Sequence, residues 1–136
     1  ASDVWSVTSY SELHKDAEDI NRWNLLHPDE KNRVSYLNEC LDKTKGPIIA
    51  CSDYVKLVSE QISPYIDISF TSIGTDGFGR SGTRSELRDF FEIDKYYIAL
   101  AAINALYKEN KIDKKIVQKV IKTYNIDPKK INPLKC

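Results

Sequence analysis

Residues 66–82 read IDISFTSIGTDGFGRSG, and four of the chain's five glycines lie in the last nine residues of this stretch. Apolar and polar residues alternate over residues 66–73, as they do in a strand with one dry face. Residues 83–91 follow a helical pattern, with Thr83 and Glu86 spaced as a capping box. Glycines between a strand and a helix let the backbone turn with positive φ and approach another group closely. The stretch therefore predicts a strand, a glycine loop and a helix in succession.

Two further strands are expected on the N-terminal side of this stretch. Residues 4–9 are rich in β-forming residues, and residues 47–51 are a continuous apolar run of the kind found in parallel sheets covered on both faces. One helix is expected to begin after a cap at Ser9 and to end before Pro28. The other predicted helices span residues 36–43, 54–65, 95–110 and 114–124, and Asp94 is expected to cap the one that begins at residue 95. The tail from residue 125 is expected to be extended.

Strands that alternate with helices predict an α/β protein with a layered sheet and right-handed crossovers. The length of 136 residues fits a single domain, residues 1–136. Three strands are few for such a sheet, and the chain opens on a strand and contains no Met. We therefore expect a fragment of a longer protein, with a partner strand missing on the N-terminal side.

The composition excludes two classes of partner. Lys and Arg number 20, and Asp and Glu also number 20, so no net positive field would attract nucleic acid or an anionic membrane. No apolar run approaches the roughly 20 residues that span a bilayer.

The three cysteines, Cys40, Cys51 and Cys136, show no CxxC spacing, which suggests reduced thiols in the cytoplasm.

The glycine loop contains two overlapping phosphate-binding patterns. Residues 74–81, GTDGFGRS, are one residue away from a P-loop, and residues 77–82 satisfy the dinucleotide pattern G-x-G-x-x-G. A P-loop requires lysine where Arg80 stands, and Asp76 would repel phosphate. Gly82 precedes the helix instead of lying inside it. We interpret the loop as a tight connector. The residues for which an anion site or an interface remains a hypothesis are Gly74, Asp76, Gly77, Phe78, Gly79, Arg80 and Ser81.

Other candidate chemistry is sparse. His14 and His27 lie far apart in the sequence, with no cysteine or carboxylate spacing that makes a metal site. Ser81 is not part of a G-x-S-x-G elbow. We predict no catalytic, cofactor-binding or metal-binding residue in this chain.

Four segments stand out together: VWSVTSYSEL at residues 4–13, RWNLLHP at 22–28, SDYVKL at 52–57 and GTDGFGRS at 74–81. They closely resemble the C-terminal domain of the homodimeric bacterial pyruvate dehydrogenase decarboxylating, acetyl-transferring component. The octet is specific to that branch, since related transketolases carry a looser F-G-x-S version. The resemblance runs nearly end to end.

The resemblance implies a transketolase-type C-terminal domain, a three-layer α/β/α sandwich with a mostly parallel sheet, here without its first strand and helix. It also implies a parent oxidoreductase that uses thiamine diphosphate and Mg²⁺ at a site between two preceding domains. We therefore expect neither cofactor on this chain. The implied partners are the remaining domains, a second copy in a homodimer and the lipoyl acetyltransferase of a cytoplasmic complex.

Three functional hypotheses follow. The chain is a structural domain that supports the dimer of a thiamine-dependent pyruvate dehydrogenase component. Alternatively, the glycine loop and the start of the next helix bind a regulatory anion or small effector. The third hypothesis is a free-standing nucleotide-binding module that uses residues 74–81.

Overall fold

The computed structural model describes residues 2–136, which divide into two compact units. Unit 1 comprises the chain up to Lys45 together with Gln61–Asp67. Unit 2 comprises Gly46–Glu60 and Ile68–Cys136. The chain therefore leaves unit 1, enters unit 2, returns for a short segment and then completes unit 2.

Unit 1 is built on helix α1, Tyr10–Leu26, with the short helix α2, Tyr36–Leu41, and the 3₁₀ turn η1, Ser63–Tyr65. Ser9 caps α1 as predicted, since its hydroxyl accepts a hydrogen bond from the backbone N–H of Glu12 at 3.3 Å. The carboxylate of Asp16 on α1 accepts a hydrogen bond from the N–H of Tyr36 at the start of α2. The buried apolar side chains of unit 1 are Ala17, Leu37 and Ile62.

The predicted strand over residues 4–9 is wrong. These residues belong to no helix or strand, with a bend at Thr8, and Val4 is 94% exposed. Val, Trp and Thr favour extended backbone, but a strand also requires a neighbour with which to exchange hydrogen bonds. No strand pairs with these residues in the part of the chain that the structure describes.

Unit 2 contains a two-stranded parallel sheet made of β1, Ile48–Cys51, and β2, Phe70–Ile73. Ile48 pairs with Phe70, and Cys51 pairs with Ile73. A helical connection joins the two parallel strands, as parallel pairing requires. The α/β class predicted from the sequence is confirmed.

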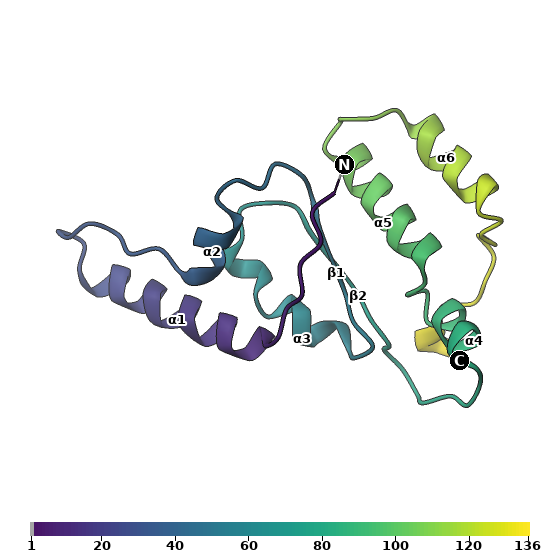
Figure 1. The fold of residues 1–136 in the computed structure, drawn as a ribbon, viewed down its shortest axis with the longest axis horizontal. Coiled ribbons are helices and arrows are strands. Elements are labelled where there is room, and N and C mark those ends of the chain that lie inside the picture. Colours follow the sequence, from purple (N-terminus) through teal and green to yellow (C-terminus); the bar gives the residue numbers. More distant parts are fainter. Residues whose placement is uncertain (1) are drawn as a thin grey trace. The chain divides into compact units, whose positions relative to one another are not determined.

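The remaining elements of unit 2 are helices (Figure 1). They are α3, Lys56–Glu60; α4, Arg84–Phe90; α5, Lys95–Lys108; α6, Lys114–Thr123; and the 3₁₀ turn η2, Pro133–Lys135. Helix α5 contacts both strands and packs against α6, whereas α3 contacts β2. Ser72 of β2 bonds to α3, and its neighbour Ile73 lines a cavity with α5 and α6. Because successive strand residues face opposite sides, α3 and α5 form layers on the two faces of the sheet.

The caps of α4 and α5 form as the sequence predicts. Thr83 and Glu86 make a reciprocal capping box, with the N–H of Thr83 bonded to the Glu86 carboxylate at 2.8 Å. These hydrogen bonds from Thr83 lower the pKa of Glu86. The carboxylate of Asp94 accepts the N–H groups of Tyr96 and Tyr97 at the start of α5. Local side-chain chemistry thus fixes where both helices begin.

Three other predictions need correction. The single helix expected over residues 54–65 is broken into α3 and η1, because the hydroxyl of Ser52 bonds to the N–H of Tyr54 in a turn and Pro64 cannot continue a helical ladder. The strand expected over residues 66–73 begins only at Phe70, because the four residues of β1 pair with Phe70–Ile73 and with no earlier residue. The tail is not wholly extended, since η2 forms with the side chain of Asn132 accepting the N–H of Leu134.

No helix within residues 2–136 combines the length and the apolar character needed to cross a bilayer.

Candidate functional site

The first residues of the glycine loop are fastened to the segment that follows β1. The N–H of Thr75 donates to the carbonyl oxygen of Tyr54 at 3.0 Å, and the Thr75 hydroxyl donates to the carbonyl oxygen of Asp53 at 3.0 Å. Gly74 is buried here, and a Cβ at this position would overlap the carbonyl oxygen of Tyr54 and lie 3.1 Å from the nitrogen of Lys56. Two backbone segments meet in van der Waals contact, so only glycine fits.

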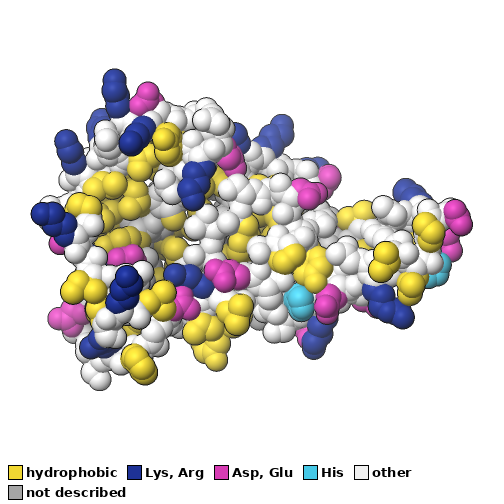
Figure 2. All heavy atoms as spheres, turned by 180° about the vertical axis from the view of Figure 1, so that it is seen from behind, with side chains coloured by type: hydrophobic (Ala, Val, Ile, Leu, Met, Phe, Trp, Pro, Cys, Tyr) yellow, Lys and Arg dark blue, Asp and Glu magenta, His cyan; other side chains and the backbone are white. Residues whose placement is uncertain are grey.

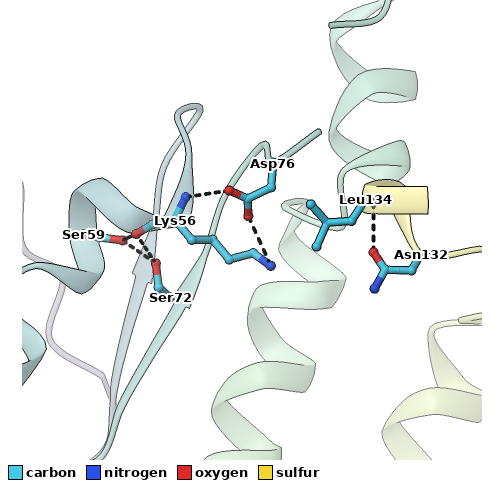
Figure 3. Close-up of polar contacts among 6 residues, drawn as sticks. All are labelled: Lys56, Ser59, Ser72, Asp76, Asn132 and Leu134. Atoms are coloured by element: carbon cyan, nitrogen blue, oxygen red, sulfur yellow. Dashed lines mark hydrogen bonds and ion pairs between the residues drawn. The ribbon is translucent and has the colours of Figure 1, made fainter. Parts of the chain in front are cut away.

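Asp76 makes two contacts with Lys56, the first residue of α3 (Figure 3). Its Oδ1 accepts the backbone N–H of Lys56 at 3.1 Å, and its Oδ2 lies 3.3 Å from the Lys56 ammonium. Both side chains are partly shielded from water, with exposed fractions of 21% for Asp76 and 37% for Lys56. Asp76 therefore caps α3 from a distant part of the sequence and holds the loop against it.

The backbone beneath this pair is also tied down. The hydroxyls of Ser59 on α3 and Ser72 on β2 contact each other, and each also lies within hydrogen-bond distance of the carbonyl oxygen of Lys56. Their two protons can therefore serve two of these three contacts, one between the hydroxyls or one from each to the carbonyl oxygen. Ser59 is buried, so its hydroxyl needs these partners. Helix α3 is thereby joined to the middle of β2, directly before the glycine loop.

Gly77 supplies the positive φ predicted for the loop, with φ of 103°. A Cβ on Gly77 would lie 3.2 Å from the carbonyl oxygen of Pro133, so the C-terminal turn η2 packs against the loop at this point. Lys130 holds the same tail nearby, because its ammonium bonds to the carbonyl oxygen of Asp89 in α4. The loop is therefore supported by α3 and by η2.

The second half of the loop is open to solvent. Phe78, Gly79, Arg80 and Ser81 are exposed, and Phe78 has 82% of its surface accessible. A Cβ on Gly79 would meet no atom within 4 Å. The Arg80 guanidinium lies 5.0 Å from the ring centroid of Phe90 in α4, a cation–π distance. Gly74, Asp76 and Gly77 thus contact other segments of the chain, whereas Phe78 is largely exposed and Arg80 lies over α4.

A cleft of about 500 Å³ lies between the outer half of the loop and α4. Arg80 lines it together with Arg84 and Arg88 of α4, and Asp53 supplies a carboxylate. Phe78 and Phe91 are among its apolar lining residues. Sequence reasoning missed Arg84, Arg88 and Asp53. The sequence did contain a signal for the two arginines: Arg80, Arg84 and Arg88 are spaced by four residues. This spacing places Arg84 and Arg88 on one face of a helix.

Cys51 ends β1 close to this cleft. Its thiol is 3.8 Å from the carbonyl oxygen of Ile93, and Ile93 lines the cleft. Burial and the nearby carboxylate of Asp53 raise the pKa of Cys51, with Arg88 acting in the opposite direction. The thiol is therefore protonated at neutral pH and is a weak nucleophile.

A second cavity, of about 340 Å³, lies among the sheet, α5 and α6. Tyr97 lines it, and burial raises the pKa of Tyr97 to about 12, with a further contribution from Glu92. Its other lining residues include Leu100, Val117 and Ile121. The phenol stays neutral at physiological pH, and the lining also includes Lys56, Glu92 and Asn104.

The two histidines have structural surroundings in unit 1. The Nδ1 atom of His14 is 3.0 Å from the carbonyl oxygen of Gln61, and its ring packs edge-on to Tyr65. The ring of His27 stacks on Trp23 at a centroid distance of 4.3 Å. Residues 2–136 contain no cluster of three or more His, Cys, Asp or Glu side chains placed to hold a metal ion.

Comparison with known proteins gives the family. The model of the transketolase-like TK C-terminal domain matches residues 1–94, which include both strands, the glycine loop and α4. The chain belongs to this family. The predicted resemblance to a transketolase-type C-terminal domain is therefore confirmed.

Within the transketolase-like family, the chain is similar to pyruvate dehydrogenase E1 components. The chain is 48% identical over 136 residues to the pyruvate dehydrogenase E1 component of Pseudomonas aeruginosa. It is 49% identical over 133 residues to that of Buchnera aphidicola subsp. Acyrthosiphon pisum and 46% identical over 133 residues to that of Escherichia coli K12. These alignments cover 97–99% of the chain, and the chain spans 15% of the length of each relative.

The Asp76 contacts make a testable prediction for this transketolase-like domain. Asp76→Ala removes both the cap on α3 and the ion pair with Lys56, and we expect it to lower the free energy of unfolding by about 1–2 kcal/mol. Asp76→Asn keeps an oxygen that can accept the Lys56 N–H, so its loss should be smaller. Urea denaturation followed by circular dichroism measures both. Equal losses for the two variants would show that the charge, and not the cap, is the important contact.

Proposed function

We propose that this chain is the non-catalytic C-terminal domain of a thiamine-dependent pyruvate dehydrogenase component. That component decarboxylates pyruvate and transfers the acetyl unit to the lipoyl group of a partner acetyltransferase in the bacterial cytoplasm. The observation that carries the proposal is identity of 46–49% over nearly the whole chain to pyruvate dehydrogenase E1 components. The chain corresponds to 15% of those proteins, so the reaction itself is assigned to the longer protein.

The described residues of this chain do not fit a site for thiamine diphosphate and its Mg²⁺. Mg²⁺ is bound in proteins by carboxylate oxygens together with phosphate oxygens and water. The described residues offer no cluster of carboxylate and imidazole ligands, and Asp76 in the glycine loop is already engaged by Lys56. We therefore place the cofactor and the catalytic residues in other domains of the longer protein.

Helix α5 supports the role in the dimer. The middle of this helix, residues 98–106, is apolar except for Asn104. Ala105 is nevertheless the one buried residue of α5 in the described chain, and the other side chains of α5 are half-buried or exposed. A helix that is apolar on nearly every side is stable when more than one face is covered. We propose that other domains of the longer protein, or the second copy in a homodimer, cover what α6 and the sheet leave open.

The exposed surface of unit 2 is consistent with such contacts. On the face drawn in Figure 2, hydrophobic side chains are visible between Lys and Arg side chains over α4, α5 and α6. Tyr96 and Tyr107, at the two ends of α5, and Ile116 on α6 are among the exposed large apolar residues. Aromatic and aliphatic side chains rimmed by charges are typical of protein interfaces.

The test compares two proteins. This chain alone, supplied with pyruvate, thiamine diphosphate and Mg²⁺, should release no CO₂. The longer protein truncated before this chain keeps its catalytic residues but should lose dimerisation, measured by analytical ultracentrifugation, and with it most of its activity. Turnover by the isolated chain would refute the non-catalytic role. A truncated protein that remains dimeric and fully active would refute the supporting role.

A nucleotide-binding module is the second candidate, and the geometry favours it less. The carboxylate of Asp76 occupies the loop, and Gly82 precedes the cap residue Thr83 instead of lying inside α4. A dinucleotide site needs that third glycine where helix and strand pack closely. Calorimetric titration with ATP and with NAD should give no binding heat.

A further inference from the structure

The cleft between the glycine loop and α4 carries an excess of positive charge. Arg80, Arg84 and Arg88 line it, against the single carboxylate of Asp53. The chain as a whole has equal numbers of acidic and basic residues, so this excess is local. None of the ion pairs found within residues 2–136 includes any of these three arginines. Three guanidinium groups without a carboxylate partner therefore face one concave surface.

The framework places all three arginines beside the cleft and holds the Arg80 guanidinium before any ligand arrives. Arg84 and Arg88 are four residues apart on α4, so they lie on the same helix face. Arg80 is held over the ring of Phe90 in the same helix. The loop that carries Arg80 is fixed behind the cleft by the Asp76–Lys56 pair and by the contact of Gly77 with η2. A preformed site spends less of its binding free energy on ordering its own side chains.

The cleft also has an apolar wall. Leu87, Phe91 and Ile93 line it, and the largely exposed ring of Phe78 stands among the same lining residues. Its volume of about 500 Å³ lies within the range of small-molecule sites in proteins. A bare inorganic ion would use the guanidinium groups but leave the apolar wall without a contact.

We propose that this cleft binds a small organic dianion, a phosphate monoester or a dicarboxylate with an apolar body. Guanidinium groups bind both anions through paired hydrogen bonds. Two negative charges balance the formal excess of the three arginines over Asp53. The ring of Phe78 would cover the apolar part of the ligand. The proposal goes beyond the supporting role and is independent of it.

Calorimetric titration of the full-length protein tests the site with two probes, phenyl phosphate and succinate, at pH 8. At least one should bind, and raising the salt concentration from 0.05 to 0.5 M should weaken it. Phenol, the neutral analogue of the first probe, should not bind. Binding of phenyl phosphate alone identifies a phosphate ester site, and binding of succinate alone identifies a dicarboxylate site.

Variants locate the binding. Arg84→Gln and Arg88→Gln should each weaken the bound probe about tenfold, because each removes a charge-assisted hydrogen bond. Arg33→Gln is the matched control, since the Arg33 guanidinium lies over Trp23 in unit 1 and should leave binding unchanged. Phe78→Ala should weaken phenyl phosphate more than succinate. The proposal is overturned if neither probe binds, or if binding persists in both Arg84→Gln and Arg88→Gln proteins that retain the wild-type circular dichroism spectrum.

Discussion

Gly74→Ala is expected to lower the free energy of unfolding of unit 2 by about 3 kcal/mol, the upper part of the usual range for overpacking a fixed site. The new Cβ would overlap the carbonyl oxygen of Tyr54 and press on the backbone nitrogen and the side chain of Lys56. These neighbours cannot give way easily. The Tyr54 carbonyl accepts the N–H of Thr75, and the Lys56 nitrogen donates to Asp76. Relief of the overlap would break the contacts that hold the loop to α3.

The matched control is Gly79→Ala in the same loop. A Cβ at position 79 meets no atom within 4 Å, and Gly79 does not have a positive φ. We expect the stability of this variant to be unchanged within about 0.5 kcal/mol, or slightly increased because alanine restricts the unfolded chain. Thermal and urea denaturation of both variants gives the comparison. Equal stability of the two variants would mean that β2 and the residue 53–56 segment do not approach as closely as the structure has them.

The contrast between Gly74 and Gly79 also shows how far the sequence predicts the loop. The cluster of glycines predicted close approach and positive φ, and the structure places these at different residues. Gly74 permits the close approach, and Gly77 has the positive φ. At Gly79 neither requirement applies. Composition alone cannot assign these roles, because they depend on which distant backbone lies against each residue.

Local signals predicted local structure well. The side chains of Ser9, Thr83 and Asp94 cap helices where the sequence placed them. Such caps depend on residues at most three positions apart, so a single sequence contains the whole interaction. The apolar run of residues 47–51 also predicted a strand, which forms as β1. Its residues are less covered than predicted, since Ala50 is buried, Ile48 and Ile49 are half-buried and Cys51 is exposed.

Contacts between residues that lie far apart in the chain were not predicted from the sequence. Residues 4–9 have the composition of a strand but pair with no strand in the described part of the chain. The contacts between Asp76 and Lys56 join residues 20 positions apart. The arginine cleft depends on how the glycine loop folds back toward α4. Whether the seven candidate residues of the loop form an anion site or an interface stays a prediction.

The sequence also did not predict that the chain returns to unit 1. Residues 61–67 were expected to continue a helix and a strand of the sheet, but they belong to unit 1. Ile62 is 3% exposed there, and the carbonyl oxygen of Gln61 lies 3.0 Å from the Nδ1 atom of His14 in α1. The segment therefore completes the small core of unit 1.

Ile62→Ala should lower the free energy of unfolding of unit 1 by about 3 kcal/mol, because it removes buried methyl groups and leaves a cavity. Both tryptophans, Trp5 and Trp23, lie in unit 1, so tryptophan fluorescence during urea denaturation of this chain reports that unit. Ile131→Ala is the control, since Ile131 in unit 2 is 67% exposed and should change stability by less than about 0.5 kcal/mol. If both variants show the same fluorescence midpoint, residues 61–67 do not contribute to the core of unit 1. A lower midpoint for Ile62→Ala alone would establish that the first unit requires the segment that returns to it.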